Sequence, residues 1–261
     1  NLKHPRLNAE GVLFCQLSAN RVLPMEILGA LVAGSAIGAV LGFVGAGGAM
    51  LSVPILVYLF GYQPHQASVA ALAVVIVAAL SGLYPRFKSR EILVKEALII
   101  WALGSAANIG AATLVKYISD SLLLTGFCAV IIFAAITMLQ KPTQAAEKPI
   151  PFPILILLSL LIGSITGLFG IGGGFLAVPI LVLAFNTPQN KAAGTSLLII
   201  VLNCTTALVA HHSSWPDIKW SIPLFMGISA LFVGQWAGKK SAKTNPVILR
   251  KSFAALLFAI A

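Results

Sequence analysis

The sequence predicts an all-α protein that crosses a membrane several times. Charged residues make up 9% of the 261 positions and apolar residues 59%, whereas soluble domains carry about 25% charged residues. The mean hydropathy is +0.98, and the apolar residues fall into runs of about 20, the length that a helix needs to cross the hydrocarbon layer. A third observation, an internal repeat, divides the membrane region into two halves of about four helical segments each.

The first repeat is expected to cover residues 25–139, after a polar and amphipathic N-terminal segment, residues 1–24. Its first helix begins at Met25, is interrupted by the glycine-rich stretch 45–49, and resumes as a short piece that ends at Phe60. Each of the apolar runs that follow is long enough to span the membrane. These runs cover residues 65–83, 92–114 and 121–139.

A polar, proline-rich stretch separates this repeat from the second. Residues 140–151 are therefore predicted to be a linker. The second repeat is expected to cover residues 152–261, and its last helix to extend past Ala261, so that the chain ends inside its final span. The expected helices are 152–169, 175–185, 190–210, 220–238 and a last one from 247, with a glycine-rich break at 170–174.

The repeat appears when the sequence is shifted against itself by 125 residues, which places Gly38 on Gly163. From Gly38 to Val57, 11 of 20 aligned positions are then identical without a gap, including five glycines and one proline. Shared apolar composition alone does not align glycines in this way. The two halves are therefore interpreted as internal repeats.

The basic loops leave two membrane arrangements open. Simple alternation of spans would place the basic segment 86–95 opposite the basic segment 239–250, which violates the tendency of Lys and Arg to stay on the cytoplasmic side. An odd number of crossings in each repeat would place both segments on one side and would make the repeats inverted. We favour the inverted arrangement.

The two glycine clusters are the predicted substrate site. Glycine costs about 1 kcal/mol relative to alanine inside a helix, and irregular backbone at membrane depth is tolerated only where protein encloses it or where it lines a cavity. Broken helices at matching positions indicate the binding site of a transporter. The predicted site residues are Gly45, Gly47, Gly48, Gly170, Gly172, Gly173 and Gly174, with Pro54 and Pro179 as helix-break or hinge residues.

Other glycines have a different explanation. Gly34, Gly38 and Gly42 are spaced by four residues, as are Gly163 and Gly167 and also Gly234 and Gly238. Small residues at this spacing let membrane helices approach closely. We interpret these seven glycines as packing residues rather than as parts of the site.

The charge pattern favours an anion as the ligand. Free N–H groups at unwound glycines and at helix N-termini attract negative charge. All seven Asp and Glu residues are expected in loops or at span ends, so none would repel an anion at the centre of the membrane. Thr195, Ser196 and Asn203 are the predicted side-chain ligands; the alternative is that each hydroxyl bonds to its own helix backbone.

Other kinds of chemistry are not indicated by the sequence. The basic residues are scattered over loops, so no nucleic-acid partner is predicted. The three cysteines have no metal-site spacing, and catalytic, nucleotide-binding and metal motifs are absent from the sequence. We therefore predict no enzyme activity, no cofactor and no metal, and we expect the lipid bilayer and a small anion as the partners.

The double motif Gly-xxx-Gly-xx-Gly-x-Gly-Gly-xxxxx-Pro-Ile-Leu, with Ala-Gly-Thr-Ser-Leu after its second copy, resembles the TauE/SafE family of sulfite exporters. The resemblance covers the chain from about Leu28 to the end. It implies a multi-pass permease of the bacterial inner membrane that carries sulfite or organosulfonates such as sulfoacetate. The first repeat departs from the pattern, because residues 68–72 read Ser-Val-Ala-Ala-Leu where Gly-Thr-Ser-Leu is common.

Together these features predict an exporter that holds its anion at mid-membrane between the two breaks and exposes it alternately by rocking one repeat against the other. An inside-negative potential contributes about 2.3 kcal/mol per charge per 100 mV, so anion export can proceed without a coupling ion. One alternative is proton- or sodium-coupled uptake of another organic anion. A remote alternative is a membrane enzyme or an assembly factor that resembles transporters.

Overall fold

The computed structural model describes residues 24–45, 48–114, 120–139, 151–169, 174–185 and 187–241, and a few positions between 244 and 258. The predicted N-terminal segment and linker therefore lie almost wholly outside the described residues. Every regular element within these ranges is helical. The elements are α2 (Pro24–Val44), α3 (Gly48–Tyr58), α4 (Pro64–Lys88), α5 (Val94–Leu114), α6 (Asp120–Leu139), α7 (Phe152–Phe169), α8 (Gly174–Phe185), α9 (Gln189–Ala210), the 3-10 helix η2 (His212–Asp217) and α10 (Ser221–Ser241).

Four of the described helices are long and apolar enough to cross a membrane, namely α2, α4, α9 and α10. The apolar stretch Phe152–Thr166 of α7 is shorter. Large apolar side chains lie exposed on the outside of these helices, for example Val32 on α2 and Phe232 on α10. Lipid tails are the solvent in which such a surface is stable. The predicted all-α, multi-pass membrane fold is confirmed.

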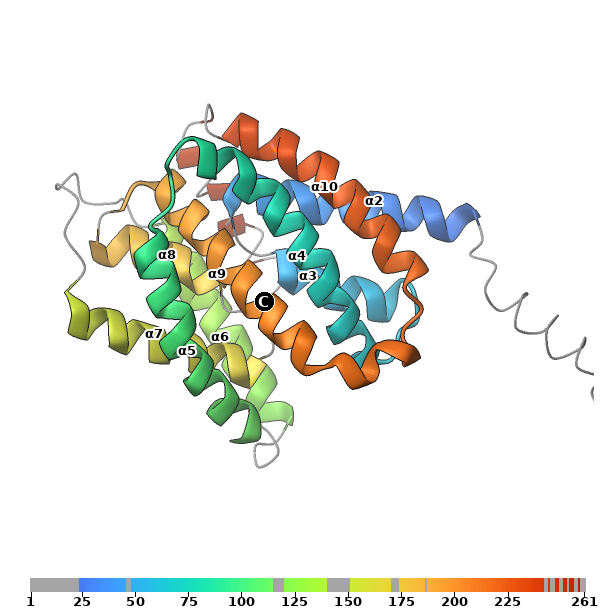
Figure 1. Ribbon diagram of the computed structural model, residues 1–261, viewed down its shortest axis with the longest axis horizontal. Helices are drawn as coiled ribbons and strands as arrows, with labels where there is room; N and C mark the ends of the chain where they lie inside the picture. The colour runs from blue at the N-terminus through green and yellow to red at the C-terminus, as the bar shows by residue number, and fades with distance from the viewer. Residues whose placement is uncertain are drawn as a thin grey trace, which may run out of the picture.

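The helices pack in two long pairs with a third pair between them. Figure 1 shows α2 beside α10 along one edge of the molecule and α5 beside α7 along the other, with α4 and α9 between these pairs. One apolar cluster joins α2, α3, α4 and α10, and a second joins α5 to α8. Helix α9 contributes to both, through Leu197 and Ile200 to the first and through Ile199 to the second. The core therefore connects across α9.

Glycines let the two helices of each outer pair approach each other closely. A Cβ atom on Gly38 would lie 2.4 Å from the carbonyl oxygen of Ala230 on α10, and one on Gly163 would lie 2.1 Å from the carbonyl oxygen of Gly104 on α5. The corresponding distances for Gly34 and Gly42, both to α10, are 2.1 and 2.6 Å. Side chains larger than a hydrogen would separate these helices. The predicted packing role is confirmed for these four glycines.

The order of the helices follows the shift found in the sequence. Helices α7, α8, α9 and α10 begin 128, 126, 125 and 127 residues after α2, α3, α4 and α5. The outer pairs agree with this correspondence, because α2 packs on α10 while its counterpart α7 packs on α5, the counterpart of α10. The helix bounds and the packing are both compatible with the predicted repeat.

The counterparts α4 and α9 run antiparallel. At one end of the pair the backbone N–H of Leu93, just after α4, donates to the Thr195 hydroxyl near the start of α9 (3.0 Å). At the other end His65, near the start of α4, lies 3.0 Å from the hydroxyl of Ser214, just after α9. Inverted repeats require their equivalent helices to run in opposite directions. The inverted arrangement that we favoured has this geometry.

The two basic segments meet at one end of the bundle. Arg86 in the last turn of α4 donates to the hydroxyl of Ser241 at the end of α10 (3.2 Å), which brings the α4–α5 loop next to Lys239 and Lys240. We call this the basic end; it comprises residues 86–95 of the α4–α5 region and residues 239–241 of α10. The opposite end carries the α3–α4 loop and η2.

Side chains tie the opposite end together. The Tyr62 hydroxyl donates to the carbonyl oxygen of Lys219, and the Gln66 amide donates to that of Asp217 (3.0 Å). Burial and, less strongly, the negative charge of Glu26 raise the pKa of Tyr62 to about 12. The phenol therefore keeps its proton near neutral pH and stays a hydrogen-bond donor.

Candidate functional site

The first predicted break begins where α2 ends. Helix α2 stops at Val44, Gly45 has a φ of +79°, and α3 begins at Gly48. The left-handed region is accessible to glycine because it has no Cβ atom. A Cβ on Gly45 would also lie 2.5 Å from the side chain of Ala193 on α9. Glycine is therefore required here both by the turn and by the contact with α9.

The remaining predicted glycines are described only in part. Gly47, Gly170, Gly172 and Gly173 lie outside the described residues. Gly48 and Gly174 are the first residues of α3 and α8, so these helices start one or two residues earlier than expected. Gly48 packs against Leu41 of α2, which leaves no room for a side chain. The two predicted hinge residues lie inside the resumed helices, Pro54 in α3 and Pro179 in α8.

A buried arginine contacts the last turn of α2. Arg86 is 3% exposed, and its guanidinium donates to the carbonyl oxygen of Gly42 (3.0 Å) and to the Ser241 hydroxyl. That hydroxyl in turn donates to the carbonyl oxygen of Phe43 (2.7 Å). Carbonyls at a helix C-terminus lack intrahelical partners and carry the negative end of the helix dipole. Arg86 and Ser241 together satisfy two of them, those of Gly42 and Phe43.

Among the described residues, none supplies a counter-charge in the hydrogen-bond shell of Arg86. Its acceptors are two backbone carbonyls, of Gly42 and Gly82, and one hydroxyl. The nearby acid, Glu91, is half-buried in the α4–α5 loop. Its backbone N–H donates to the carbonyl oxygen of Arg86 (3.0 Å), and its carboxylate acts on the guanidinium through its field. A positive charge enclosed by protein inside a membrane bundle is costly and is typically kept for a function.

Arg86 is not among the site residues predicted from the sequence. The apolar run was expected to end at residue 83, before a loop that contains Pro85 and Arg86. The structure corrects this: α4 continues through Pro85 to Lys88, so Arg86 lies inside the helix and under α2 rather than in a loop. The signal available was its spacing, one helical turn after the small residue Gly82.

The face of α9 that contacts the turn after α2 also carries several polar residues. At about 100° per residue, five of the residues from 189 to 203 fall within about 40° of one line along the helix, and we call this the α9 face. Its central contact is that of Ala193 with Gly45. Ser196 on this face is fully buried. The α9 face consists of Gln189, Ala193, Ser196, Ile200 and Asn203.

Thr195 lies on another face of α9. Its hydroxyl accepts the hydrogen bond from Leu93 and donates to the carbonyl oxygen of Lys191 (2.8 Å). The first bond holds the α4–α5 loop against α9, and the second stays within α9. The structure therefore places Ser196 and Asn203 on one face but does not bring Thr195 to it. As a substrate ligand Thr195 stays a prediction.

We expect Thr195→Val to lower the free energy of unfolding by about 1–3 kcal/mol, because the Leu93 N–H loses its acceptor while the side-chain shape is kept. The measurement is thermal unfolding in detergent. Ser68→Ala is the control, since that exposed hydroxyl donates only to the carbonyl oxygen of Pro64 in its own helix. An equal loss of stability in both variants would contradict the role of Thr195 as a tie between segments.

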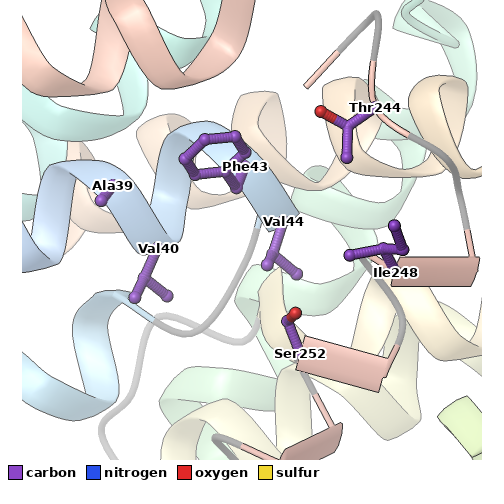
Figure 2. A pocket seen from close by; sticks show the side chains of 7 residues that line it. All are labelled: Ala39, Val40, Phe43, Val44, Thr244, Ile248 and Ser252. Atoms are coloured by element: carbon purple, nitrogen blue, oxygen red, sulfur yellow. The ribbon is translucent and has the colours of Figure 1, made fainter. Parts of the chain in front are cut away.

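A cavity of about 350 Å³ adjoins the last two turns of α2 (Figure 2). Its lining is mainly apolar, and its polar groups are the hydroxyls of Thr244 and Ser252. The Thr244 hydroxyl donates to the carbonyl oxygen of Lys240. This lining does not supply the donors that an anion requires. The residues that line it are Ala39, Val40, Phe43, Val44, Thr244, Ile248 and Ser252.

The residues that the structure describes contain no group of three or more His, Cys, Asp or Glu side chains placed to hold a metal ion. Cys204 is buried in α9 and Cys128 lies in α6, and both are free thiols. Near the end of α2, the described polar groups that could bind a solute are therefore Arg86, Ser241 and the polar residues of the α9 face.

Membrane-spanning helices, antiparallel counterparts and a glycine turn between two helices are features that occur in multi-pass membrane transporters. Residues 30–261 match the family described as Sulfite exporter TauE/SafE, and the chain belongs to this family. The predicted family resemblance is thus confirmed. A membrane transporter of this kind acts on a small-molecule solute and resides in a lipid bilayer.

Curated relatives carry the same class of name. The probable membrane transporter protein YunE of Bacillus subtilis is 30% identical over 237 residues, which are 80% of this chain and 85% of YunE. YdhB of the same organism is 26% identical over 86% of this chain and 94% of its own length. MJ0441 of Methanocaldococcus jannaschii is 26% identical over 87% and 91%, respectively. No solved structure matches the chain significantly.

Proposed function

We propose that the protein exports a small sulfur-containing anion, such as sulfite or an organosulfonate, across the bacterial inner membrane. The observation that carries this proposal is Arg86, a buried positive charge beside the glycine turn of α2 that has no ion-pair partner among the residues that the structure describes. The described acids agree with it. Glu26 and Asp217 are exposed, and Glu91 and Glu96 are half-buried near the α4–α5 loop.

The proposed anion site lies between the two breaks. Backbone N–H groups of the glycines in both breaks would hold the anion, and Arg86 would supply positive potential from the α4 side. Ser196 and Asn203 would donate from the α9 face, and Thr195 would assist from the neighbouring face. Movement of one repeat against the other, with Pro54 and Pro179 near the hinges, would expose the site alternately.

The charge distribution indicates a direction. Lys and Arg accumulate on the cytoplasmic side of membrane proteins, so the basic end would face the cytoplasm. Exposed lysines and arginines at that end, among them Lys88, Arg90 and Lys239, would raise the local concentration of anions at the entrance. The inside-negative potential would then drive the anion outward, by about 2.3 kcal/mol per charge per 100 mV.

Flux measurements in proteoliposomes test this function. The panel is sulfite, sulfoacetate, thiosulfate, sulfate and small carboxylates, each measured with and without a membrane potential and a pH gradient. We expect flux of sulfite or sulfoacetate that increases with the potential and does not depend on the pH gradient. Equal flux of all anions would show that the protein is a general anion pathway. Dependence of the flux on a proton or sodium gradient would indicate coupled uptake instead.

A further inference from the structure

The side-chain amide of Gln189 has no hydrogen-bond partner although it is buried. The residue is 6% exposed, and neither its Nε2 nor its Oε1 atom finds a partner. It is the only side chain among the described residues with such atoms. An amide left without partners costs about 1–3 kcal/mol. Native proteins rarely retain such a group without a bound water, an ion or a function to explain it.

Gln189 stands at the start of the α9 face. It is the first residue of α9 and lies about one turn before Ala193, the residue that touches Gly45. The first backbone hydrogen bond of the helix runs from the N–H of Ala192 to the carbonyl oxygen of Pro188 (3.0 Å). The N–H groups of the preceding turn therefore point out of the helix at its positive end. Because α9 begins where the α4–α5 loop packs against it, this turn lies at the basic end.

We propose that Gln189 contacts the transported anion as it enters from the basic end, and that it selects anions that also carry a hydrogen-bond donor. This inference rests on the proposed function in one respect, that the solute is an anion. The Nε2 group would donate to an oxyanion oxygen, and Oε1 would accept from a hydroxyl of the same solute. An anion with acceptors only would leave Oε1 unpaired, so among the proposed solutes the site would bind sulfoacetate, which has no donor, less tightly than hydrogensulfite, which has one.

Two pairs of probes separate these requirements. Isethionate and ethanesulfonate share a sulfonate and differ by one hydroxyl, and lactate and propionate differ in the same way on a carboxylate. We expect the wild-type protein to transport the hydroxylated member of a pair with the lower KM. Gln189→Met, which keeps a similar volume without polar atoms, should raise the KM for that member about tenfold, the equivalent of one hydrogen bond. The KM for its partner should change less.

Stability and a matched variant separate ligand binding from a structural role. Gln189→Met should leave the unfolding temperature unchanged or higher, because it removes the unpaired amide. Gln66→Met removes an amide at the opposite end that is already paired with Asp217; it should lower the unfolding temperature and leave both KM values unchanged.

Two results would overturn different statements. If Gln189→Met leaves the KM values of both hydroxylated probes unchanged, the amide binds no solute, and the inference fails while anion transport stands. If the wild type carries lactate but neither sulfonate, and Gln189→Met raises the KM for lactate, the sulfonate proposal fails and the role of Gln189 stands.

Discussion

Gly45→Ala is expected to lower the free energy of unfolding by about 2–5 kcal/mol and to abolish transport. An L-residue in the left-handed region costs about 1–2 kcal/mol, and Gly45 has a φ of +79°. The added methyl would also come within 2.5–2.7 Å of the Cβ, Cα and carbonyl oxygen of Ala193, and overpacking of this kind costs about 1–3 kcal/mol. The overlap with Ala193 can be relieved only if α2 and α9 separate. That movement would change the spacing between the Gly45 turn and the α9 face.

Gly61→Ala provides the control for this prediction. Gly61 has a φ of +66°, and no atom lies within 4 Å of the position that its Cβ would take. Its substitution adds backbone strain alone, about 1–2 kcal/mol, and should leave transport intact. The difference between the two variants in thermal unfolding then measures the packing of Gly45 against Ala193. An equal loss of stability would show that this packing is not tight.

The fold class follows from properties that each segment carries by itself. A low charged fraction and apolar runs of sufficient length predict spanning helices whatever their neighbours are, and α7, for example, has the predicted bounds, 152–169. The predicted end of α4 was wrong, because Pro85 does not terminate that helix. Its last turn is held from outside, by the contacts of Arg86 with α2 and α10, and local sequence does not contain those contacts.

The candidate site depends on which helix faces contact each other, and these contacts could be predicted from the sequence only in part. Helical geometry already separates Thr195 from Ser196 by about 100°. The sequence does not reveal that Ala193 touches Gly45 or that Leu93 bonds to Thr195, because these residues are far apart along the chain. Glycine clusters mark positions where close approach is needed, whereas the identity of the approaching helix is a tertiary property.

The two repeats are unequal at this site. The shift of 125 residues places Gln189, Ser196 and Asn203 on Pro64, Ala71 and Ala78, and the two alanines are buried in α4. The polar α9 face therefore has an apolar counterpart on α4. An inverted pair of repeats supplies two similar breaks, but the polar side-chain ligands would come mainly from the second repeat.

Arg86→Met is expected to reduce anion flux about 100-fold or more, with a change in the free energy of unfolding of no more than about 2 kcal/mol. A unit charge at 4 Å contributes about 4 kcal/mol at an effective dielectric constant of 20, and a 100-fold reduction corresponds to about 2.7 kcal/mol. Stability should change little because two effects oppose each other. The carbonyl of Gly42 and the Ser241 hydroxyl lose a donor, while the cost of enclosing an unpaired guanidinium disappears.

Lys88→Met is the matched control, since it removes the same charge two residues further along α4, where the side chain is exposed. Water and salt screen an exposed charge, so the flux of this variant should stay within about threefold of the wild type. Arg86→Lys keeps the charge without the planar fork and should recover part of the flux that Arg86→Met loses. If Arg86→Lys is as inactive as Arg86→Met and both are less stable than the wild type by several kcal/mol, Arg86 holds the end of α2 in place and contributes no potential to the anion.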